Sequence, residues 1–455
     1  MIYPNTPSLT DEQLKILCDE YRNHSCITYN TTLDVKRGLR NADGTGVLAG
    51  MTNICDVVGY TRDDNGHITP SDGHLLYRGI DLYDIVHEAV NSDRFLFEEV
   101  EWLLLLGTLP SSKELSMFQN MLETHHELPD GFAETMIMSA PSPNIMNKMA
   151  RSVLAMYAYD KKAEDNNLEN ILRQSINLIA EIPTMMVYAY QIYRHAWKHQ
   201  SMYFHYPKPH TSTAEHILAT YREDQSFTHE EAKLLDLCLI CHGDHGGGNN
   251  STFTDRVVSS TGSDTYSAIA AAILSLKGPK HGGANLKVME QLDNLMRENV
   301  DPSSDTSVYN ALKQILRKET GDHSGLLYGI GHAVYTKSDP RAQILKQYSY
   351  DLSRTKGFEK EYDLLCMIEK LAPEVFQEVK GTTKHVCANV DLYSGLIYRM
   401  LGIDEVLYTP IFAIARAGGW CAHRMEEIEF SNRIIRPAYA WCGERGKQYI
   451  PLDER

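Results

Sequence analysis

Apolar residues along this chain recur mostly at helical spacing, three or four positions apart. Leu14, Leu17 and Tyr21 follow this spacing directly after Thr10. Thr10 and Gln13 form a capping-box pattern, in which each side chain satisfies a backbone amide at the start of a helix. The pattern predicts a helix that begins just after Thr10.

Further helices are expected where the same signals return. Thr228 to Glu231 form a second capping box, which opens an apolar run over 234–241. Residues 98–106 and 264–276 are two more strong helix candidates. Helix packing is therefore expected to supply most of the hydrophobic core.

Strand signals are few and lie between Leu33 and Tyr77. Residues 57–60 and 67–68 flank the sequence Asp64-Asn65-Gly66, and Asn-Gly is typical of a tight hairpin turn. The predicted fold class is mainly α and multi-helical, with a minor N-terminal β-hairpin.

The composition narrows the class of protein. With 455 residues the chain is expected to form two or three domains, or one large domain with a smaller one inserted. A formal net charge of -16 argues against general binding to nucleic acid or to anionic membranes. The nine cysteines are scattered and odd in number, and the N-terminus carries no signal-peptide pattern, so a cytoplasmic protein is expected. An anionic ligand would have to meet a local cluster of Arg, Lys or His.

The first candidate for chemistry is the glycine-rich segment 242–251, which holds His242, Asp244 and His245. Three interpretations stay open at this point. A histidine could donate to an anionic substrate, the His-x-x-His pair with Asp244 could bind a metal ion, or the glycines could simply end a helix.

The second candidate is His281, in the glycine-rich break 277–285. A helix is expected to end at Lys277 and another to begin near Asn285, which could cap it. A histidine close to a helix N-terminus tends to stay neutral and can donate a hydrogen bond, as a developing enolate oxygen requires. A solvent-facing histidine in a turn is the alternative.

The third candidate is the run from Gly329 to Tyr335, followed by Arg341 after a turn at Pro340. The glycines around His332 allow backbone amides to face a ligand. Arginine binds a carboxylate through two parallel hydrogen bonds, which lysine cannot do. His332 and Arg341 therefore suit the carbonyl and the carboxylate of a keto-acid.

The fourth candidate is Asp391, a lone acid between apolar neighbours. A partly desolvated carboxylate is a stronger base than an exposed one, as a general base requires. Asp391 could also cap a helix that begins at Leu392. Arg416 and Arg436 follow, and together with Arg341 they could bind a tricarboxylate.

These segments resemble the citrate synthase family, in order and in approximate spacing. The matching motifs are HGDHGGGN from His242, GPKHGGAN around His281, GIGHAVYTKSDPR around His332, NVDLYSG around Asp391, LLYRGIDLYDI from Leu75 and FEEVEWLLLLGTLP from Phe97. The resemblance covers nearly the whole chain. Gly246-Gly247-Gly248 departs from the family, since many members carry an acid there.

The resemblance implies the first reaction of the tricarboxylic acid cycle, in which acetyl-CoA condenses with oxaloacetate and the citryl-CoA formed is hydrolysed to citrate. Asp391 would take the methyl proton, His281 would hydrogen-bond to the enol or enolate oxygen, and His332 would polarise the ketone and protonate the alkoxide. The implied oxaloacetate or citrate contacts are His245, Asn249, Arg341, Arg416 and Arg436. The implied contacts of the acyl-CoA are Gly329, Ile330, Gly331, Asn389 and, more weakly, Arg40 and Lys384.

The resemblance also implies an architecture and a set of partners. A large helical domain would comprise residues 1–282 and 399–455, and a small one residues 283–398, with the substrates in a cleft between them. Arg436 would reach across a subunit boundary, which implies a homodimer or a higher homo-oligomer with a shared active site. No metal and no permanently bound cofactor are expected, and neither nucleic acid nor a membrane is an expected partner.

Two other functions are compatible with parts of the same sequence. A 2-methylcitrate synthase would use propionyl-CoA with the same motifs, because one methylene changes binding by only about 1–3 kcal/mol. A metal-dependent hydrolase would use His242, Asp244, His245 and perhaps His281. A non-catalytic helical scaffold is disfavoured by the joint presence of Asp391, His281 and His332.

Overall fold

The computed structural model describes residues 10–24, 33–42, 44–63, 68–381, 385–431, 433–442 and 445–454. Contacts between Cα atoms group the chain into two units, which we describe separately. One unit comprises Ala49–Ile435, and the other comprises Met1–Leu48 together with Arg436–Arg455. Among the described residues, no helix is both long enough and apolar enough to cross a bilayer.

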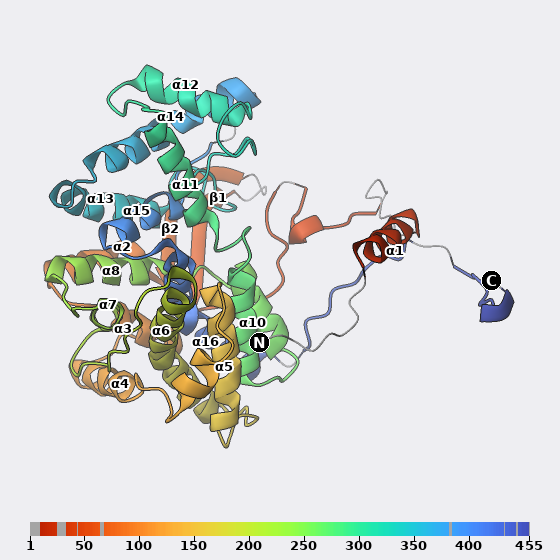
Figure 1. The fold of residues 1–455 in the computed structure, drawn as a ribbon, viewed down its shortest axis with the longest axis horizontal. Helices are drawn as coiled ribbons and strands as arrows, with labels where there is room; N and C mark the ends of the chain where they lie inside the picture. Colours follow the sequence, from red (N-terminus) through yellow and green to blue (C-terminus); the bar gives the residue numbers. More distant parts are fainter. Residues whose placement is uncertain are drawn as a thin grey trace. The chain divides into compact units, whose positions relative to one another are not determined.

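The smaller unit contains the N-terminal helix that the capping box predicts. Helix α1 spans Asp11–His24 (Figure 1). The Thr10 amide donates to Gln13 Oε1 at 2.9 Å, and the Gln13 amide donates to Thr10 Oγ1 at 3.2 Å, so the predicted box is confirmed. Two short 3-10 turns, η1 (Arg37–Leu39) and η5 (Leu452–Glu454), also belong to this unit.

The larger unit begins with a three-stranded antiparallel sheet. β1 (Cys55–Arg62) pairs with β2 (Ile68–Tyr77), and β2 pairs with β3 (Ile80–Asp81). Val57 lies opposite Leu75, and a bulge separates the pairs at Val58 and Tyr60. The predicted hairpin is therefore confirmed, while its Asn-Gly turn, Asp64 to His67, lies outside the described residues.

Helices make up most of the larger unit, which confirms the mainly α fold class. In chain order they are α2 (Leu82–Asn91), α3 (Phe97–Leu106), α4 (Ser112–Thr124), η2 (Ala133–Met138), α5 (Ile145–Met156), η3 (Tyr157–Tyr159), α6 (Leu168–Lys198), α7 (Thr213–Tyr221), α8 (His229–His242), α9 (Asn250–Ser259), α10 (Thr265–Leu276), α11 (Ala284–Arg297), α12 (Asp305–Leu316), α13 (Pro340–Thr355), α14 (Glu359–Lys380), α15 (Asp391–Met400), η4 (Glu405–Leu407) and α16 (Tyr408–Phe430).

The local signals of the sequence hold for most of these helices. The Thr228 capping box opens α8, and Asp264 caps α10 through the amide of Ser267. Cys238 and Cys241 are fully buried on α8 and belong to the hydrophobic core. One prediction is wrong: α11 begins at Ala284, so Asn285 lies inside the helix with a buried side chain instead of capping it.

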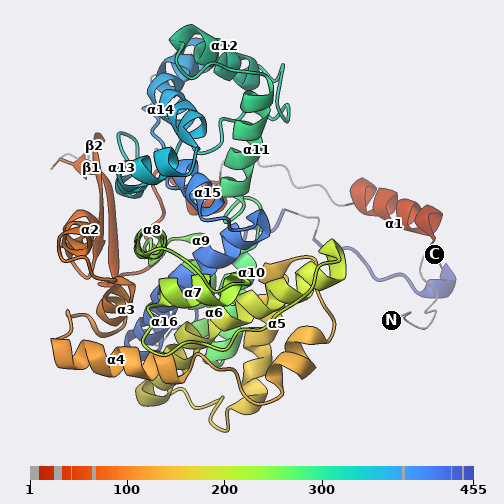
Figure 2. The same cartoon turned by 60° about the vertical axis from the view of Figure 1, so that its left-hand side comes forward.

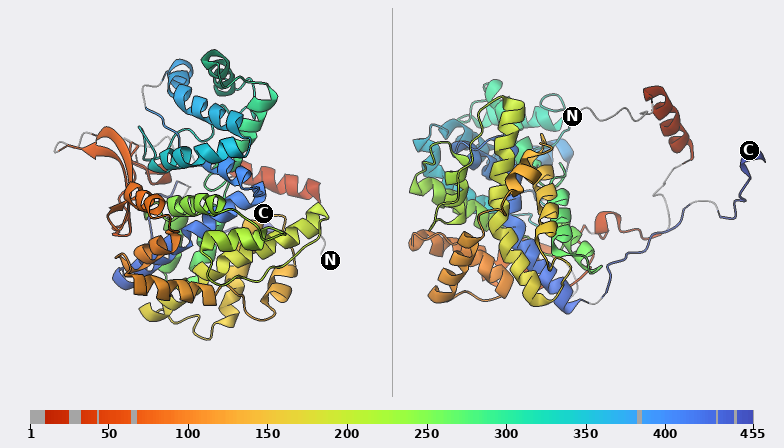
Figure 3. Two further views of the ribbon diagram at one scale, coloured as in Figure 1. Left: turned by 90° about the vertical axis from the view of Figure 1, so that its left-hand side faces the viewer. Right: turned by 60° about the horizontal axis from the view of Figure 1, so that its bottom comes forward.

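The helices of the larger unit form two groups (Figures 2 and 3). Helices α11 to α15 gather on one side, and α3 to α10 with α16 gather on the other. Helix α16 runs through the second group, where it contacts α3, α6, α8, α9 and α10. Its residues are almost all buried from Tyr408 to Arg424, so α16 is the central element of that group. The predicted domain boundaries, 283 and 398, stay a prediction.

The β-hairpin lies against the segment that carries His332. A Cβ atom at Gly73 would lie 2.2 Å from the carbonyl oxygen of Ser338, and one at Gly59 would lie 2.6 Å from that of Val334. Both distances are far below van der Waals contact, so only glycine fits at either position. The Gly73 amide also donates to Ser338 Oγ at 3.0 Å. The hairpin thus fixes the backbone just after His332.

Candidate active site

A short backbone pairing joins the His332 segment to the Asp391 segment. Ile330 and Ala388 form an antiparallel bridge. The Gly331 amide donates to the Cys387 carbonyl at 2.7 Å, and the Asn389 amide donates to the Gly329 carbonyl at 2.8 Å. Two motifs almost sixty residues apart in sequence are therefore held next to each other.

The side chain of Asn389 strengthens this junction. Its Nδ2 donates to the Gly331 carbonyl at 2.8 Å, and its Oδ1 accepts from the Asp391 amide at 3.0 Å. Asn389, Gly329, Ile330 and Gly331 were expected to contact acyl-CoA. In the structure their polar groups connect the His332 and Asp391 segments, and the CoA contacts stay a prediction.

Gly329 is required at this junction, and its replacement gives a first test. Its φ is +80°, and a Cβ would lie 3.0 Å from Leu392 Cα and 2.8 Å from Leu392 Cδ1. We expect Gly329→Ala to lower the free energy of unfolding by about 1–3 kcal/mol more than Gly331→Ala, because only the first creates a steric overlap. Urea denaturation of both variants measures the difference.

Gly331 is the matched control for that test. It has a similarly positive φ of +96°, but no described atom lies within 4 Å of its Cβ position. Gly331→Ala therefore reports the conformational cost alone. Equal destabilisation of the two variants would show that the overlap with Leu392 is relieved without cost.

Asp391 is the first residue of α15, and it does not cap that helix as the alternative interpretation held. The Asp391 amide is instead satisfied by Asn389 Oδ1. Burial raises the pKa of Asp391 to about 6, with Asp339 adding to the rise and Arg341 opposing it. A carboxylate with this pKa is ionised at neutral pH and is a better base than an exposed one.

The ring of His332 has a defined tautomer. Its Nδ1 lies 3.0 Å from the amide nitrogen of Val334 and 3.1 Å from that of Tyr335. Backbone amides only donate, so Nδ1 is an acceptor and the neutral ring carries its proton on Nε2. His332 can therefore donate through Nε2.

His332 lies beside His245, which comes from the other helix group. Their ring centroids are 5.0 Å apart, and the Tyr335 ring stacks on His332 with centroids 4.7 Å apart. His245 follows the end of α8 at His242 and is nearly buried, and its Nε2 has no partner among the described residues. The structure thus brings together two of the predicted site residues that are far apart in sequence.

Arg341 is held by an acid that the sequence analysis did not single out. Arg341 Nη2 donates to Asp339 Oδ2 at 2.7 Å, and Nε donates to Asp339 Oδ1 at 3.0 Å. Both side chains are buried, and Asp339 raises the pKa of Arg341 although burial opposes it. Asp339 also caps α13. The sequence Asp339-Pro340-Arg341, an acid before a proline, is the pattern that could have indicated this cap and the pairing with Arg341.

Arg416 is fully buried on α16, and two of its guanidinium nitrogens have no hydrogen-bond partner among the described residues. Its Nε donates to the His242 carbonyl at 2.7 Å, while Nη1 and Nη2 have no partner among the residues described. Burial lowers the pKa of Arg416, and Asp244 is the main group that opposes this. A buried guanidinium with two bare nitrogens is suited to receive a carboxylate.

The site around His245 is electropositive. Burial lowers the pKa of His245 well below its usual value, and Arg341, His332 and Arg416 lower it further. The Tyr335 ring centroid lies 5.6 Å from that of His245 and 5.8 Å from Arg341 Cζ, so these groups lie close together. The predicted residues from both helix groups converge on a place where an anion would be stabilised.

His281 lies at the start of α9, in contact with the cap of that helix. Its Nε2 is 3.1 Å from Asn249 Oδ1, 3.2 Å from Ser251 Oγ and 3.3 Å from the Ser251 amide. Asn249 caps α9, and Trp420 Nε1 donates to Ser251 Oγ at 3.1 Å. Burial, assisted by Arg416, lowers the pKa of His281 to about 4, so the ring is neutral.

The metal interpretation of the first histidine segment finds no support. Within the described ranges, no three His, Cys, Asp or Glu side chains are grouped so as to hold a metal ion. The His242 ring packs against Phe412 with centroids 4.4 Å apart, and Asp244 pairs with His423 at 2.9 Å. His242, Asp244 and His245 therefore do not form a joint ligand set.

Three predicted residues are not placed at this site. Arg40 and Arg436 belong to the smaller unit, and Lys384 lies outside the described residues. Their assignments stay predictions. Sequence reasoning also missed His423 and the role of Asp244 as a buried counter-charge for Arg416. It missed Ser251 as well, because a small polar side chain gives no distinctive pattern.

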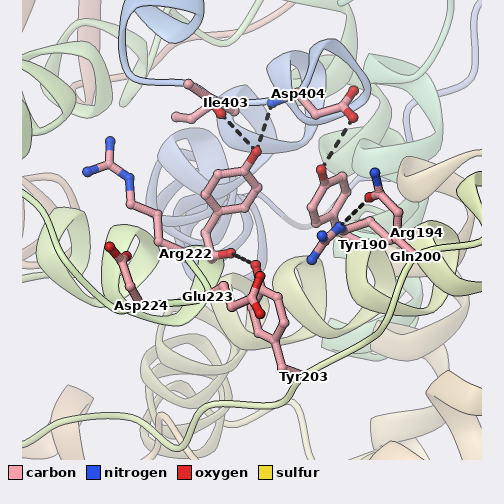
Figure 4. A pocket seen from close by; sticks show the side chains of 11 residues that line it. Tyr190, Arg194, Gln200, Tyr203, Arg222, Glu223, Asp224, Ile403 and Asp404 are labelled. Atoms are coloured by element: carbon pink, nitrogen blue, oxygen red, sulfur yellow. Dashed lines mark hydrogen bonds between the residues drawn. The ribbon is translucent and has the colours of Figure 1, made fainter.

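An open hollow of about 880 Å³ lies elsewhere, between the end of α6, α7 and the turn before η4 (Figure 4). It contains none of the predicted site residues. Its two arginines, Arg194 and Arg222, are already bonded to protein atoms: Arg194 to Gln200, and Arg222 to Glu231 and the Leu401 carbonyl. This hollow is not the place where the candidate chemistry gathers.

Comparisons with known proteins agree with the motifs. A family model described as citrate synthase, C-terminal domain, matches residues 41–438. The chain is 35% identical to a citrate synthase of Haloferax volcanii over 393 residues, which cover 84% of this chain and 93% of that protein. It is 30% identical to 2-methylcitrate synthase 2 of Corynebacterium glutamicum over 430 residues, covering 93% of this chain and 99% of that protein.

The fold is similar to that of a solved complex. The citrate synthase of Thermoplasma acidophilum, determined with carboxymethyl coenzyme A and oxaloacetate, superposes with a TM-score of 0.75 at 28% identity. The match covers 93% of this chain and 100% of that structure.

Proposed function

The chain belongs to the citrate synthase family, and from this premise we propose that it condenses acetyl-CoA with oxaloacetate and water to give citrate and CoA. One observation carries the proposal. His245, His332, Arg341 and Arg416 converge around one buried, electropositive place. A dicarboxylate keto-acid matches it, with a carboxylate against the bare nitrogens of Arg416.

We propose that oxaloacetate is held by these groups and activated by His332. The protonated Nε2 of His332 would donate to the ketone oxygen, since Nδ1 already accepts from two amides. His245 Nε2 and the Arg341 guanidinium would bind the carboxylates. A donor aimed at the ketone oxygen stabilises the alkoxide as negative charge develops there.

Asp391 and His281 would act on acetyl-CoA. The Asp391 carboxylate takes a proton from the methyl group, and His281 donates a hydrogen bond to the thioester oxygen as the enolate forms. The neutral His281 ring keeps one N–H proton, which can serve for this purpose. The enolate carbon then attacks the ketone, and His332 gives its proton to the alkoxide. Water cleaves the citryl thioester and releases CoA.

The second candidate substrate is propionyl-CoA, which would give 2-methylcitrate. The sequence identity of this chain to the 2-methylcitrate synthase of C. glutamicum, 30%, is close to its identity of 35% to the citrate synthase of H. volcanii. An extra methyl group changes the free energy of binding by only about 1–3 kcal/mol, so the family motifs do not separate the two substrates. Use of both thioesters is compatible with them.

Release of CoA tests both versions of the proposal. Purified protein is mixed with oxaloacetate and either acetyl-CoA or propionyl-CoA, and free thiol is followed with a chromogenic reagent. We expect oxaloacetate-dependent release that is faster with acetyl-CoA. Faster release with propionyl-CoA would change the assignment to a 2-methylcitrate synthase, and no release with either thioester would refute the condensing enzyme.

We further propose a homodimer or a higher homo-oligomer, in which Arg436 of one subunit completes the site of another. The support is the family membership and the resemblance of the Arg436 segment to the family. Sedimentation at micromolar concentration would contradict this if it gave only the monomer mass.

A further inference from the structure

A chain of buried charged and polar groups runs from the edge of α9 to the candidate oxaloacetate site. Arg256, on α9, pairs with Glu426 and with Glu427 Oε2, the latter at 2.9 Å. Its Nη2 donates to Nδ1 of His423 at 2.7 Å. His423 Nε2 in turn lies 2.9 Å from Asp244 Oδ2.

The order of donors along this chain is fixed. A guanidinium can only donate, so His423 Nδ1 accepts and the neutral ring carries its proton on Nε2. His423 therefore donates to Asp244. His423 and Asp244 are both completely buried, and a buried carboxylate needs partners of this kind.

Asp244 lies beside Gly419, one helical turn from Arg416 on α16, and its Oδ1 has no hydrogen-bond partner among the described residues. Although burial opposes it, His423 and Arg416 lower the pKa of Asp244 to about 2. Asp244 is also the first group that opposes the effect of burial on Arg416. It therefore supplies the counter-charge for a cation whose Nη atoms have no partner among the described residues.

Helix α16 leaves room for Asp244 at Gly419, which lies between Arg416 and His423 in the helix. Arg416, Gly419, His423 and Glu427 lie on one face of the helix, at spacings of three and four residues. A Cβ at Gly419 would lie 2.9 Å from Asp244 Oδ1 and 2.5 Å from the Gly243 carbonyl. The carboxylate therefore occupies the gap that the missing side chain leaves.

Asp244 also orders the loop that carries His245. The Gly246 amide donates to Asp244 Oδ2 at 3.3 Å, and the Asp244 amide donates to Tyr77 Oη at 3.3 Å. Displacing this carboxylate would thus affect Arg416 and His245 together.

We propose that His423 and Arg256 are positioning residues of the oxaloacetate site. They hold Asp244 in the orientation that keeps the Arg416 guanidinium and the His245 loop ready for a dicarboxylate keto-acid. This inference rests on the proposed function. Neither residue touches the substrate, and the effect of each passes through Asp244.

The test compares His423→Leu, His423→Gln and Arg424→Met in the full-length protein. Gln can still donate to Asp244 and accept from Arg256, whereas Leu can do neither. Arg424 is the matched control: it is fully buried on the same helix, but its guanidinium donates to Ser259, Thr265, Asn166 and the Ser263 carbonyl, away from the site. His423→Leu and Arg424→Met both lose buried contacts of the same helix.

Two measurements separate positioning from a structural role. Calorimetry gives the affinity for oxaloacetate alone, and CoA release gives kcat and KM for each substrate. We expect His423→Leu to weaken oxaloacetate binding and raise its KM by about tenfold or more, the order of effect known for outer partners of a ligand-binding group. The KM for acetyl-CoA should change by less than about threefold, and His423→Gln should recover most of the affinity.

The outcomes are distinguishable from failure of the proposed function. If the unmodified protein binds no oxaloacetate, both the function and this inference are refuted. If it binds oxaloacetate and turns over, but His423→Leu binds as tightly as Arg424→Met, only the positioning role is overturned. If His423→Leu does not fold, Arg256→Lys replaces it, and an affinity equal to that of Arg424→Met would overturn the positioning role in the same way.

Discussion

Asp391→Asn is expected to lower kcat by about 10²–10⁴-fold while leaving the affinity for oxaloacetate nearly unchanged. The amide has the size of the carboxylate but cannot accept the methyl proton. Asp391 lies at the junction with the His332 segment and is not among the groups around His245. CoA release measures kcat, and calorimetry with oxaloacetate measures the affinity. Asp264→Asn, which keeps a capping side chain on α10, is the control for the substitution itself.

The pKa of Asp391 adds a second readout. With a pKa raised to about 6, kcat/KM should rise about tenfold per pH unit below pH 6 and become flat above it. In the folded protein this carboxyl holds its proton more tightly than in the unfolded chain. Its contribution to stability is therefore present at low pH and is lost as the pH rises through about 6.

Asp391→Asn should consequently stabilise the protein while inactivating it. The rise of the Asp391 pKa from its ordinary value of 3.8 to about 6 corresponds to at most about 3 kcal/mol at pH 7. Thermal unfolding should show a higher midpoint for the variant at about pH 7.5 and little difference at about pH 4. Retained activity, or a lower midpoint at the higher pH, would contradict the assigned role.

His281→Ala is expected to lower kcat by about 10²–10³-fold, the usual loss when one donor to a developing oxyanion is removed. With a pKa of about 4 the ring is neutral throughout the working pH range, so it acts as a donor without titrating. The variant should therefore keep the pH dependence set by Asp391. A kcat within about threefold of the original would refute the donor role of His281.

Oxaloacetate binding should be preserved in His281→Ala, because the ring is not among the groups that surround His245. Calorimetry would show this directly. A loss of oxaloacetate affinity instead would indicate that the ring supports the keto-acid site.

The motifs led to His245, His281, His332 and Asp391 as candidate site residues, and their roles stay predictions. Local rules correctly predicted the first capping boxes and the hairpin. These signals depend on a few neighbouring residues, so they are visible in the chain itself.

What the sequence could not predict depends on contacts between distant segments. The capping interpretation of Asp391 was wrong because α15 begins at Asp391 itself, and that of Asn285 was wrong because α11 begins one residue before it, at Ala284. The pairing of 329–331 with 387–389 and the contact of Asp244 with His423 join segments about sixty and about 180 residues apart. No local pattern encodes such contacts.

Arg416, Gly419 and His423 share one face of α16, and this limits where residues can be inserted into or deleted from the chain. Each residue of an α-helix turns by about 100°, so one residue inserted between Arg416 and His423 would rotate every later side chain away from its partner. Trp420 donates to Ser251 beside His281. An insertion before Trp420 would rotate it away from Ser251, and an insertion after it would separate it from His423 by one more residue. Insertions and deletions should therefore be tolerated between α6 and α7, where the chain is irregular, and be eliminated within this helix even where every individual residue is retained.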